Sequence, residues 1–278
     1  MDIQAINWNE VWKKKRARVY DDGQNQAYWD GRAPSFALAT DGGPYVAKFL
    51  EVLKPEPDWR ILDVGCAAGT LAVPLASRVC QVTALDISPI MLDCLQSTCR
   101  KRGIQNIRPV QASWTDDWDL LPIEPHDVAI ASRSLIVPDL RESLEKLDRF
   151  ATRRVCITTP VGSGSMDPAM FKAIGRRSPF DADYIYVYNL LYQMGAQAHV
   201  SFISYQEDRS YQDLDEAFRA LQSKVGNLLP QEEKALRDYI RRSFVCRADR
   251  FYRRGPLTIC WAAMWWTPLH QRKSLDFL

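Results

Sequence analysis

One short stretch in the first third of the chain constrains the fold more than any other. Residues 61–64 are apolar except at one position, and a turn bracketed by Gly65 and Gly69 follows them. The apolar residues 71–76 come next and have the length of a short helix. A buried strand, a turn of small residues and a helix form the first unit of a doubly wound α/β sheet, in which ligands bind at the carboxyl ends of the strands. The sequence therefore predicts such a sheet, with a ligand against the turn.

The composition of the turn excludes two common ligand classes. A dinucleotide-binding turn needs glycine at its first, third and sixth positions. Counted from Gly65, those positions hold Gly65, Ala67 and Thr70, so two of them fail. A phosphate-binding loop ends in Gly-Lys-Ser or Gly-Lys-Thr, and that ending is absent. The remaining pattern is acidic-x-Gly-x-small-x-Gly, from Asp63 to Gly69.

Together with Asp86, which ends the next predicted strand, this pattern resembles the class I S-adenosylmethionine-dependent methyltransferase family. The resemblance spans roughly residues 28–205 and the last predicted strand. It implies S-adenosyl-L-methionine as cofactor, with its amino-acid part over the turn and both ribose hydroxyls on Asp86. A carboxylate can accept two hydroxyl hydrogen bonds, and charged acceptors form the stronger ones. Two alternatives stay open: a turn that binds no ligand, and an Asp86 that caps the following helix.

The resemblance also implies the rest of the fold. We expect a seven-stranded, mostly parallel, Rossmann-like sheet whose last strand is antiparallel. The strands are expected at 61–64, 81–85, 107–112, 126–131, 155–159, 199–205 and 257–267. We treat 1–278 as one methyltransferase domain, with residues 1–55 as an N-terminal helical lid. The last connection is longer than the family's usual hairpin, so residues 208–254 are expected to form a helical cap with helices near 213–224 and 231–244.

The cofactor contacts that the resemblance implies follow the strand ends in order. They are Trp29, Arg32, Asp63, Gly65, Cys66, Ala67, Gly69, Asp86, Ile87, Ser113, Trp114, Ser132 and Arg133.

Several of these assignments leave alternatives. Trp29 and Arg32 lie in an aromatic-rich stretch, residues 28–36, that either folds over the cofactor or packs as a surface segment. Ser113 stands where the family usually has a small polar or acidic residue beside adenine, and Trp114 is expected to be free to cover the ring. Asp116 and Asp117 are near enough to compete for the adenine amino group. Arg133 suits a carboxylate, either of the cofactor or of the methyl acceptor.

Three other patterns have a functional and a structural interpretation. Residues 1–20 read as an amphipathic helix with a basic run, and we favour tryptophans on the core over a nucleic-acid contact. Residues 138–150 read as an exposed helix rich in charge. Tyrosines at 184, 188 and 192 share one helix face, and we favour core packing over a substrate wall. The arginines of residues 241–254 either attract a phosphate, a carboxylate or an acidic protein, or are solvated and paired with Glu232, Glu233 and Asp238.

Composition narrows the possible partners, metal sites and cell compartments. A net charge of +2 in 278 residues is too small to argue for nucleic acid. Seven cysteines without a Cys-x-x-Cys pair suggest free thiols in a reducing compartment. Three histidines far apart in sequence give no support for a metal site. No signal peptide or long apolar run is present, so we expect a cytoplasmic protein without a membrane partner.

The expected activity is transfer of the sulfonium methyl group, in line, to a small-molecule acceptor. A protein acceptor is the alternative, and RNA is less favoured because the chain has Ser132-Arg133-Ser134 where many base-amino methyltransferases have an Asn-Pro-Pro-Tyr type motif. A non-catalytic binding module ranks last. A carbon or oxygen acceptor needs a general base, but none can be assigned, and Tyr28, His126 and the tyrosines of the cap are candidates without further support.

Overall fold

The computed structural model describes residues 5–16, 25–33, 36, 43–177 and 184–271. The chain divides into two compact units, which we describe separately. Unit 1 contains residues 1–159, 182–203 and 262–278, and unit 2 contains residues 160–181 and 204–261. The assignment of 1–55 as a lid and 208–254 as a cap stays a prediction.

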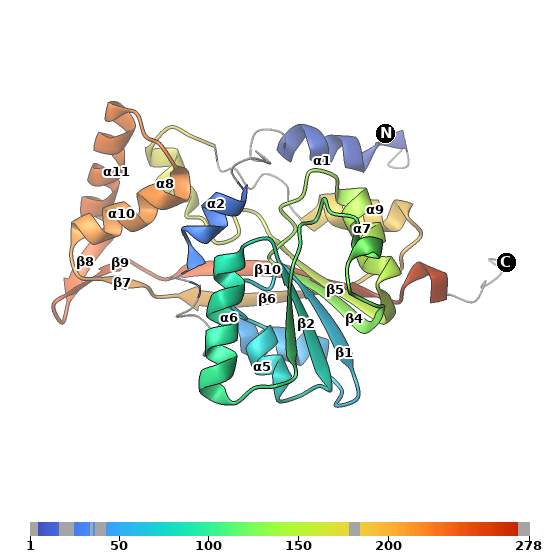
Figure 1. The fold of residues 1–278 in the computed structure, drawn as a ribbon. Coiled ribbons are helices and arrows are strands. Elements are labelled where there is room, and N and C mark those ends of the chain that lie inside the picture. Colours follow the sequence, from blue (N-terminus) through green and yellow to red (C-terminus); the bar gives the residue numbers. More distant parts are fainter. Residues whose placement is uncertain (1–4, 17–24, 34–35, 37–42, 178–183, 272–278) are drawn as a thin grey trace. The chain divides into compact units, whose positions relative to one another are not determined.

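The predicted seven-stranded sheet is confirmed (Figure 1). Its strand order is β3-β2-β1-β4-β5-β10-β6. The pairs β1–β2, β1–β4, β2–β3 and β4–β5 are parallel, and the last strands are antiparallel. The bounds are β1 Arg60–Val64, β2 Gln81–Asp86, β3 Ile107–Gln111, β4 His126–Ser132, β5 Ala151–Pro160, β6 His199–Glu207 and β10 Leu257–Trp266.

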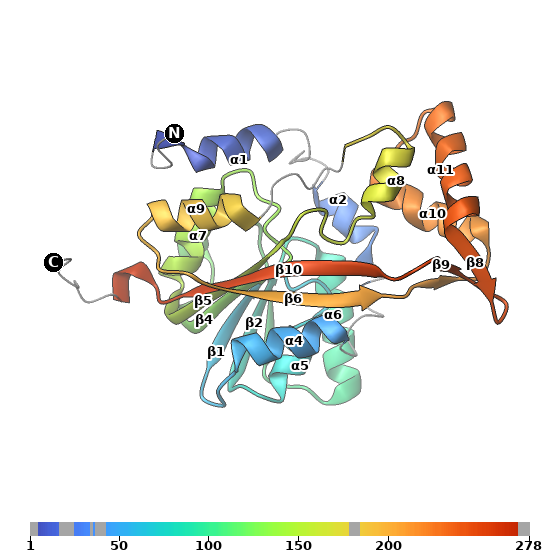
Figure 2. The same cartoon turned by 180° about the vertical axis from the view of Figure 1, so that it is seen from behind.

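Helices of unit 1 cover both faces of the sheet. On one face are α4 Pro44–Leu53, α5 Ala72–Ala76 and α6 Pro89–Arg102, and on the other are α1 Trp8–Arg16, α7 Leu140–Arg149 and α9 Tyr184–Gln193 (Figures 1 and 2). The sequence Ser88-Pro89 predicts a cap and a first helical residue, and Gly103 after three basic residues predicts the end of this helix. Both limits of α6 are confirmed: Ser88 Oγ accepts a hydrogen bond from Met91 N at 3.1 Å, and Gly103 ends the helix in the left-handed region. Asp86 is the last residue of β2, two residues before the cap of α6.

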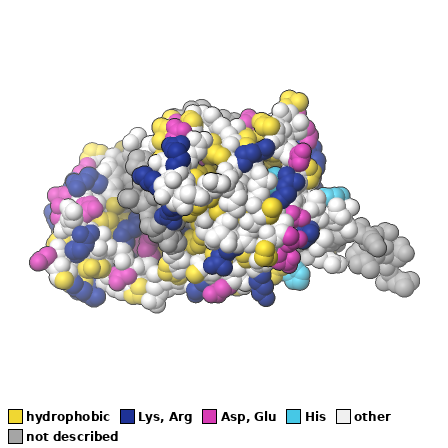
Figure 3. Space-filling view, turned by 60° about the horizontal axis from the view of Figure 1, so that its bottom comes forward, with side chains coloured by type: hydrophobic (Ala, Val, Ile, Leu, Met, Phe, Trp, Pro, Cys, Tyr) yellow, Lys and Arg dark blue, Asp and Glu magenta, His cyan; other side chains and the backbone are white. Residues whose placement is uncertain are grey.

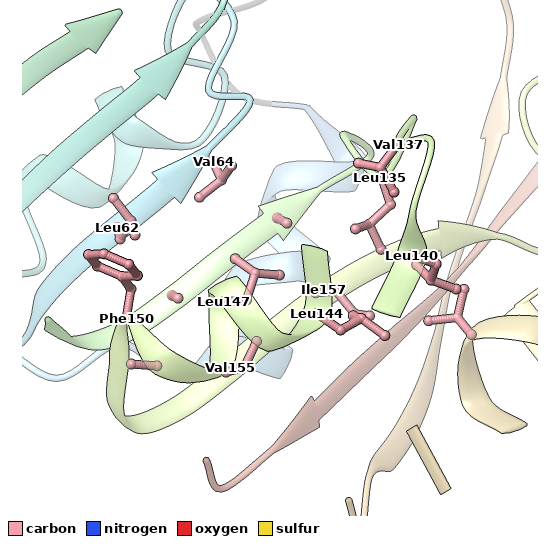
Figure 4. Packing of buried hydrophobic residues seen from close by; sticks show 14 of the residues in the cluster. Leu62, Val64, Leu135, Val137, Leu140, Leu144, Leu147, Phe150, Val155 and Ile157 are labelled. Atoms are coloured by element: carbon pink, nitrogen blue, oxygen red, sulfur yellow. The ribbon is translucent and has the colours of Figure 1, made fainter. Parts of the chain in front are cut away.

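The helix predicted at 138–150 is not fully exposed. It begins at Leu140, after Asp139 accepts a hydrogen bond from Glu142 N, and its apolar face is buried. Figure 4 shows Leu144 and Leu147 of this helix pointing toward Val155 and Ile157 of β5. Apolar residues at helical spacing within a charged sequence make the helix amphipathic, and the sheet covers that side.

The described part of the N-terminal helix packs as we favoured. Trp12 of α1 is 0% exposed, and its Nε1 donates to Val137 O at 2.9 Å, in the connection between β4 and α7. Asn9 Nδ2 donates to Asp139 Oδ1 at 3.0 Å. Residues 1–4 and 17–20 of the predicted helix lie outside the described residues. Two lysines of the basic run also contact neighbouring elements: Lys13 Nζ lies 2.7 Å from Asp139 Oδ2, and Lys15 Nζ lies 4.8 Å from the centroid of the Tyr186 ring.

The favoured interpretation of the tyrosine stripe holds for Tyr184, which packs against the core, and is wrong for Tyr188 and Tyr192. Tyr188 is 37% exposed and Tyr192 is 60% exposed, while Val187, Leu190 and Leu191 form the buried face of α9. The helix has an aliphatic stripe and a tyrosine stripe. The aliphatic stripe packs against the core, because its burial places no hydroxyl in an apolar environment. Asp183, the predicted first residue of this helix, lies outside the described residues.

Unit 2 contains the two predicted helices, α10 Leu214–Val225 and α11 Pro230–Ser243, and also α8 Pro168–Ala173. The sequence did not predict its small sheet, in which β9 Arg250–Arg253 pairs with β7 Ser210–Tyr211 and β8 Phe244–Arg247. The turn between β8 and β9 places Ala248 and Asp249 in the left-handed region without a glycine, so the usual sequence signal of a hairpin is missing.

Part of the arginine-rich stretch is structural. Arg253 Nε donates to Asp167 Oδ2 at 2.8 Å, beside the Tyr239 hydroxyl that donates to the same carboxylate. Arg250 Nε donates to Ser210 Oγ at 2.7 Å, which joins β9 to β7. The predicted pairing is right for Arg241 and Asp238, at 3.3 Å. It is wrong for the two glutamates, which bind arginines outside the stretch: Glu232 binds Arg176 and Glu233 binds Arg237.

Three further features are the length and hydropathy of the helices, the distribution of surface charge and the state of the cysteines. Among the described residues no helix is both long and apolar enough to cross a membrane. Figure 3 shows basic and acidic side chains interspersed on one face of the molecule. All seven cysteines are free.

Candidate active site

The turn after β1 requires small residues at both of its glycines. Gly65 has φ of 72°, and a Cβ there would lie 2.4 Å from Ser134 Cβ. Gly69 has φ of 96°, and a Cβ there would lie 2.5 Å from Leu95 Cδ1. Gly65 N donates to Leu85 O at 2.8 Å, which ties the turn to the end of β2. The backbone of the turn is therefore held closely between β2, α6 and the residues after β4.

Asp86 anchors the turn from the neighbouring strand. Its Oδ2 accepts a hydrogen bond from Ala67 N at 2.8 Å, and its Oδ1 accepts one from Ser88 N at 2.9 Å. The side chain is nearly buried, and this burial raises its pKa despite the two donors. Each carboxylate oxygen keeps a further lone pair, so Asp86 can also accept two ligand hydroxyls. Asp86 can therefore bind the backbone at the start of α6 and also bind a ligand, so the two alternatives do not exclude each other.

Asp63 has an unsatisfied oxygen. The side chain is 2% exposed, and its Oδ2 has no hydrogen-bond partner among the described residues. Burial, followed by the nearby charge of Asp86, raises the pKa of Asp63 to about 7. A buried carboxylate oxygen without a partner requires an explanation, and a cationic ligand at this edge would provide one.

The aromatic-rich stretch packs on the turn. Helix α2, Asn25–Asp30, and the residues after it bring Trp29, Ala33 and Phe36 against Ala67, Ala68 and Met91. Asp30 Oδ1 accepts a hydrogen bond from Ser88 Oγ at 2.5 Å, so this segment is also fixed to the connection after β2. The Arg32 guanidinium lies 4.2 Å from the centroid of the Tyr28 ring. Pro34 and Ser35 of this stretch lie outside the described residues.

The connection after β3 differs from expectation. Trp114 is not free, because its Nε1 donates to Ser134 O at 3.2 Å and its ring lies 5.5 Å from that of Trp118. Asp116 Oδ2 accepts from Ser113 N at 2.8 Å, and Asp117 Oδ1 accepts from Asp119 N at 3.1 Å. Both carboxylates therefore have a role within the loop. Ile87, which is half-buried, lies beside this loop through the Gln111 Nε2 contact to its carbonyl at 3.4 Å.

A second cluster forms where β4 and β5 end, and the sequence predicted only part of it. Arg133 has φ of 60°, and its N donates to Thr158 Oγ1 at 3.0 Å. Its guanidinium lies 4.1 Å from the centroid of the Tyr45 ring. The Tyr45 hydroxyl is bonded to Ser132 Oγ at 2.5 Å and to Thr158 Oγ1 at 2.8 Å. Burial raises the pKa of Tyr45 to about 12, so this hydroxyl is neutral near pH 7.

Sequence reasoning missed Tyr45 and Thr158. Tyr45 is the second residue of α4, and nothing in its neighbourhood distinguishes it from a core aromatic. Thr158 and Thr159 end a predicted apolar strand with two buried hydroxyls, and that change in polarity was the available signal.

Comparison with known proteins identifies the family. Residues 61–153 match the family model of a methyltransferase domain. The chain is 33% identical to an uncharacterised protein of Haemophilus influenzae over 272 residues, which cover 96% of this chain and 98% of the relative. This chain belongs to the class I S-adenosylmethionine-dependent methyltransferase family. The methyltransferase is an enzyme whose cofactor is S-adenosylmethionine.

Solved structures share the fold of this methyltransferase. The structure of BH2331, a proposed methyltransferase of Bacillus halodurans, aligns with a TM-score of 0.55 over 81% of this chain and 99% of its own, at 14% identity. YcgJ of Bacillus subtilis aligns with a TM-score of 0.51 over 80% of this chain and 97% of its own, at 15% identity. At such identities the likeness concerns the fold alone.

Two relatives of the methyltransferase have names that state an acceptor. Aklanonic acid methyltransferase DauC of a Streptomyces species is 26% identical over 159 residues, 54% of this chain and 67% of that enzyme. The 23S rRNA (uracil(1939)-C(5))-methyltransferase RlmD of Pseudomonas fluorescens is 31% identical over 123 residues, 40% of this chain and 27% of that enzyme.

The geometry removes one candidate base of the methyltransferase. His126 begins β4, at the opposite end of the strand from Ser132. Its Nε2 is bonded to Thr83 Oγ1 at 2.8 Å and its Nδ1 to Glu124 O at 2.6 Å, and burial lowers its pKa. A neutral imidazole with both nitrogens in use, away from the ligand edge, does not serve as a general base. Tyr28, in contrast, is half exposed beside Arg32.

Proposed function

We propose that this methyltransferase acts on a small-molecule acceptor. The observation that supports this proposal is the recessed position of the polar groups at the ends of β4 and β5. Tyr45 is 4% exposed and Thr158 is 0% exposed, while Ser132 and Arg133 are half-buried. A compact molecule can approach the half-buried Ser132 and Arg133 more closely than the broad surface of a folded macromolecule can.

The proposal assigns the cofactor to the ends of β1, β2 and β3. The turn from Gly65 to Gly69 holds the amino-acid part, with the Asp63 carboxylate available to a cationic group. Asp86 accepts the ribose hydroxyls through its remaining lone pairs. The connections after β2 and β3 would hold the adenine ring. The residues assigned to this site are Trp29, Arg32, Asp63, Gly65, Cys66, Ala67, Gly69, Asp86, Ile87, Ser113, Trp114 and Ser132.

The fit of these residues to the cofactor rests on charge and space. The two carboxylates and the half-buried aromatics suit a ligand that carries a sulfonium and an ammonium, whereas phosphates would be repelled. S-adenosylmethionine, when bound, would supply the methyl group: the acceptor's lone pair would form the new bond to the methyl carbon, and the electron pair of the broken carbon–sulfur bond would stay on the departing S-adenosylhomocysteine. The protein's own contribution is to hold the acceptor in line and to exclude water.

A protein or RNA acceptor is the competing proposal. The partial likeness to RlmD favours RNA, but it spans 27% of that enzyme. The likeness to DauC spans 67% of an enzyme named for a small acid. The nearly neutral net charge of +2 also gives weak support for a nucleic-acid partner.

The deciding experiment has two steps. Calorimetric titration of S-adenosylmethionine and S-adenosylhomocysteine, beside a nicotinamide dinucleotide control, measures cofactor binding, and we expect micromolar affinity for the first two only. Labelled methyl transfer into a cell extract divided into metabolites, RNA and protein then locates the acceptor. Label in metabolites supports the proposal, whereas label confined to RNA or protein overturns it. Binding without transfer to any of the three would favour a non-catalytic binding module.

A further inference from the structure

The longest uncharged run of the chain lies in a helix and a strand at the margin of the sheet. No Asp, Glu, Lys or Arg occurs from residue 184 to 206, although 25% of all residues are charged. The uncharged run 255–271 has a simple cause, because it contains β10, which lies between β5 and β6. Residues 184–206 instead contain α9, which covers one face of the sheet, and β6, its outermost strand (Figure 2). Elements in such positions normally carry charged side chains.

The outer side of α9 is apolar. Ile185, Tyr188 and Tyr192 follow one another at spacings of three and four residues, so they lie on one side of the helix, and all three are exposed. Phe202 of β6 is 53% exposed, and its ring lies 5.4 Å from that of Tyr184. Since this contact places Phe202 on the α9 side of the sheet, the helix and the strand share one apolar surface. We call Ile185, Tyr188, Tyr192 and Phe202 the α9–β6 patch, and exposed apolar patches mark interaction sites.

The outer edge of β6 offers a second kind of contact. In the sheet order β6 has β10 as its one neighbour, so its other edge pairs with no strand in the part of the chain that the structure describes. Such an edge presents N–H and C=O groups to another strand, and proteins usually block it with proline or charged side chains. Residues 199–203, the part of β6 within unit 1, contain no proline and no Asp, Glu, Lys or Arg. The sequence of this strand therefore does not oppose pairing with a further strand.

A second copy of this chain complements both features at once. A two-fold axis perpendicular to the sheet sets β6 antiparallel to β6 of the copy, which continues the ladder of hydrogen bonds. The same axis leaves both α9 helices on the same face of the joined sheet, so the two α9–β6 patches meet across it. Side chains near such an axis face their own equivalents, and like charges there would repel. The absence of charge from residue 184 to 206 removes that repulsion.

We propose that residues 184–203 form a symmetric dimer interface, in which two β6 strands pair and two α9–β6 patches pack against each other. The composition fits such an interface, because tyrosine and phenylalanine are enriched in interface cores and charged residues are depleted there. An acidic or basic partner fits less well, since this surface offers it no charge to pair with. The inference does not depend on the identity of the methyl acceptor.

The test follows the oligomeric state across protein concentration. Sedimentation velocity is recorded from low micromolar to near-millimolar protein for the wild type, Tyr192→Lys, Phe202→Lys and Leu120→Lys. Each of the first two changes brings a positive charge into the proposed interface from both copies. Leu120, in the short helix Trp118–Leu120, is 83% exposed and lies outside the patch, so Leu120→Lys is the matched control. Circular dichroism checks that every variant is folded.

We expect the wild type and Leu120→Lys to dimerise with the same dissociation constant. Tyr192→Lys and Phe202→Lys should each raise that constant by at least about 10-fold, because like charges opposite each other in an interface oppose association. Hydrogen exchange supplies a second readout. The amides of residues 199–203 should exchange more slowly in concentrated than in dilute wild-type protein, because strand pairing protects them.

Three results would overturn the inference. A wild type that stays monomeric at every concentration would show that this surface does not bind a second copy. A dimer with the same dissociation constant in all four proteins would place the interface elsewhere. A dimer in which the exchange of residues 199–203 does not depend on concentration would contradict the pairing of the two strands.

Discussion

The carboxyl edge of the sheet has two sides, one at the ends of β1 and β2 and one at the ends of β4 and β5. The two sides differ in how far apart in sequence their residues lie. At β1 and β2 the turn and the acid that holds it both come from residues 63–88, and backbone N–H groups hold the carboxylate of Asp86. At β4 and β5 the cluster joins Tyr45, Arg133 and Thr158, which are far apart in sequence and meet through side-chain hydroxyls. The first side is built by a local motif, and the second only by the assembled sheet.

The largest expected effect is on the free energy of unfolding, and it tests how closely the turn on the β1–β2 side is packed. Gly65→Ala places a Cβ 2.4 Å from Ser134 Cβ at φ of 72°, so both steric overlap and backbone strain oppose it. We expect a loss of about 4 kcal/mol in the free energy of unfolding. Urea unfolding measures it, with Gly103→Ala as control: φ there is 67°, nothing lies within 4 Å, and about 1 kcal/mol should be lost. Equal losses would show that close packing at the turn is unimportant.

A second prediction concerns how the free energy of unfolding depends on pH through Asp63, on the same side. Asp63 has a pKa of about 7 when folded, against 3.8 as its ordinary value. The unfolded chain therefore releases this proton at lower pH than the folded one, and raising the pH from about 4 to 7 favours unfolding. We expect Asp63 to remove on the order of 3 kcal/mol of stability over this range. Denaturation midpoints across pH should fall less in Asp63→Asn, and parallel profiles would contradict the prediction.

The third prediction concerns ligand binding at β2. Asp86→Asn keeps the shape of the side chain but offers an N–H₂ group where a carboxylate oxygen accepts from Ala67 N or Ser88 N. We expect weaker binding of S-adenosylhomocysteine by about 2 kcal/mol, measured by calorimetry. Asp93→Asn, an exposed position on α6, is the matched control. Unchanged affinity in Asp86→Asn would remove Asp86 from the ribose site.

The smallest effect is expected on the β4–β5 side. Tyr45→Phe removes the hydroxyl that joins Ser132 and Thr158, which lie 3.5 Å apart and can still bond each other. We expect a loss of about 1 kcal/mol in stability and no change in affinity for S-adenosylhomocysteine. If calorimetry instead shows weaker cofactor binding, then the two sides do not act separately.

The sequence predicted those parts whose cause is local. The strands, the Ser88 cap and the Gly103 end of α6 follow from neighbouring residues, and the structure confirms them. It did not predict the hairpin of β8 and β9, because Ala248 and Asp249 adopt positive φ without the usual glycine. It assigned Tyr188 and Tyr192 of α9 to the core, because helical spacing alone does not say which of two apolar stripes is buried.

The sequence by itself determined the family, the cofactor and the doubly wound sheet, because the turn from Asp63 to Gly69 and the end of the following strand are contiguous in the chain. Only the tertiary structure decided that Trp114 is bonded to the residues after β4, that His126 lies at the wrong end of its strand, and that Arg133 rests on Tyr45. These contacts join segments separated by 20 residues or more, so they depend on strand order and helix packing rather than on spacing along the sequence.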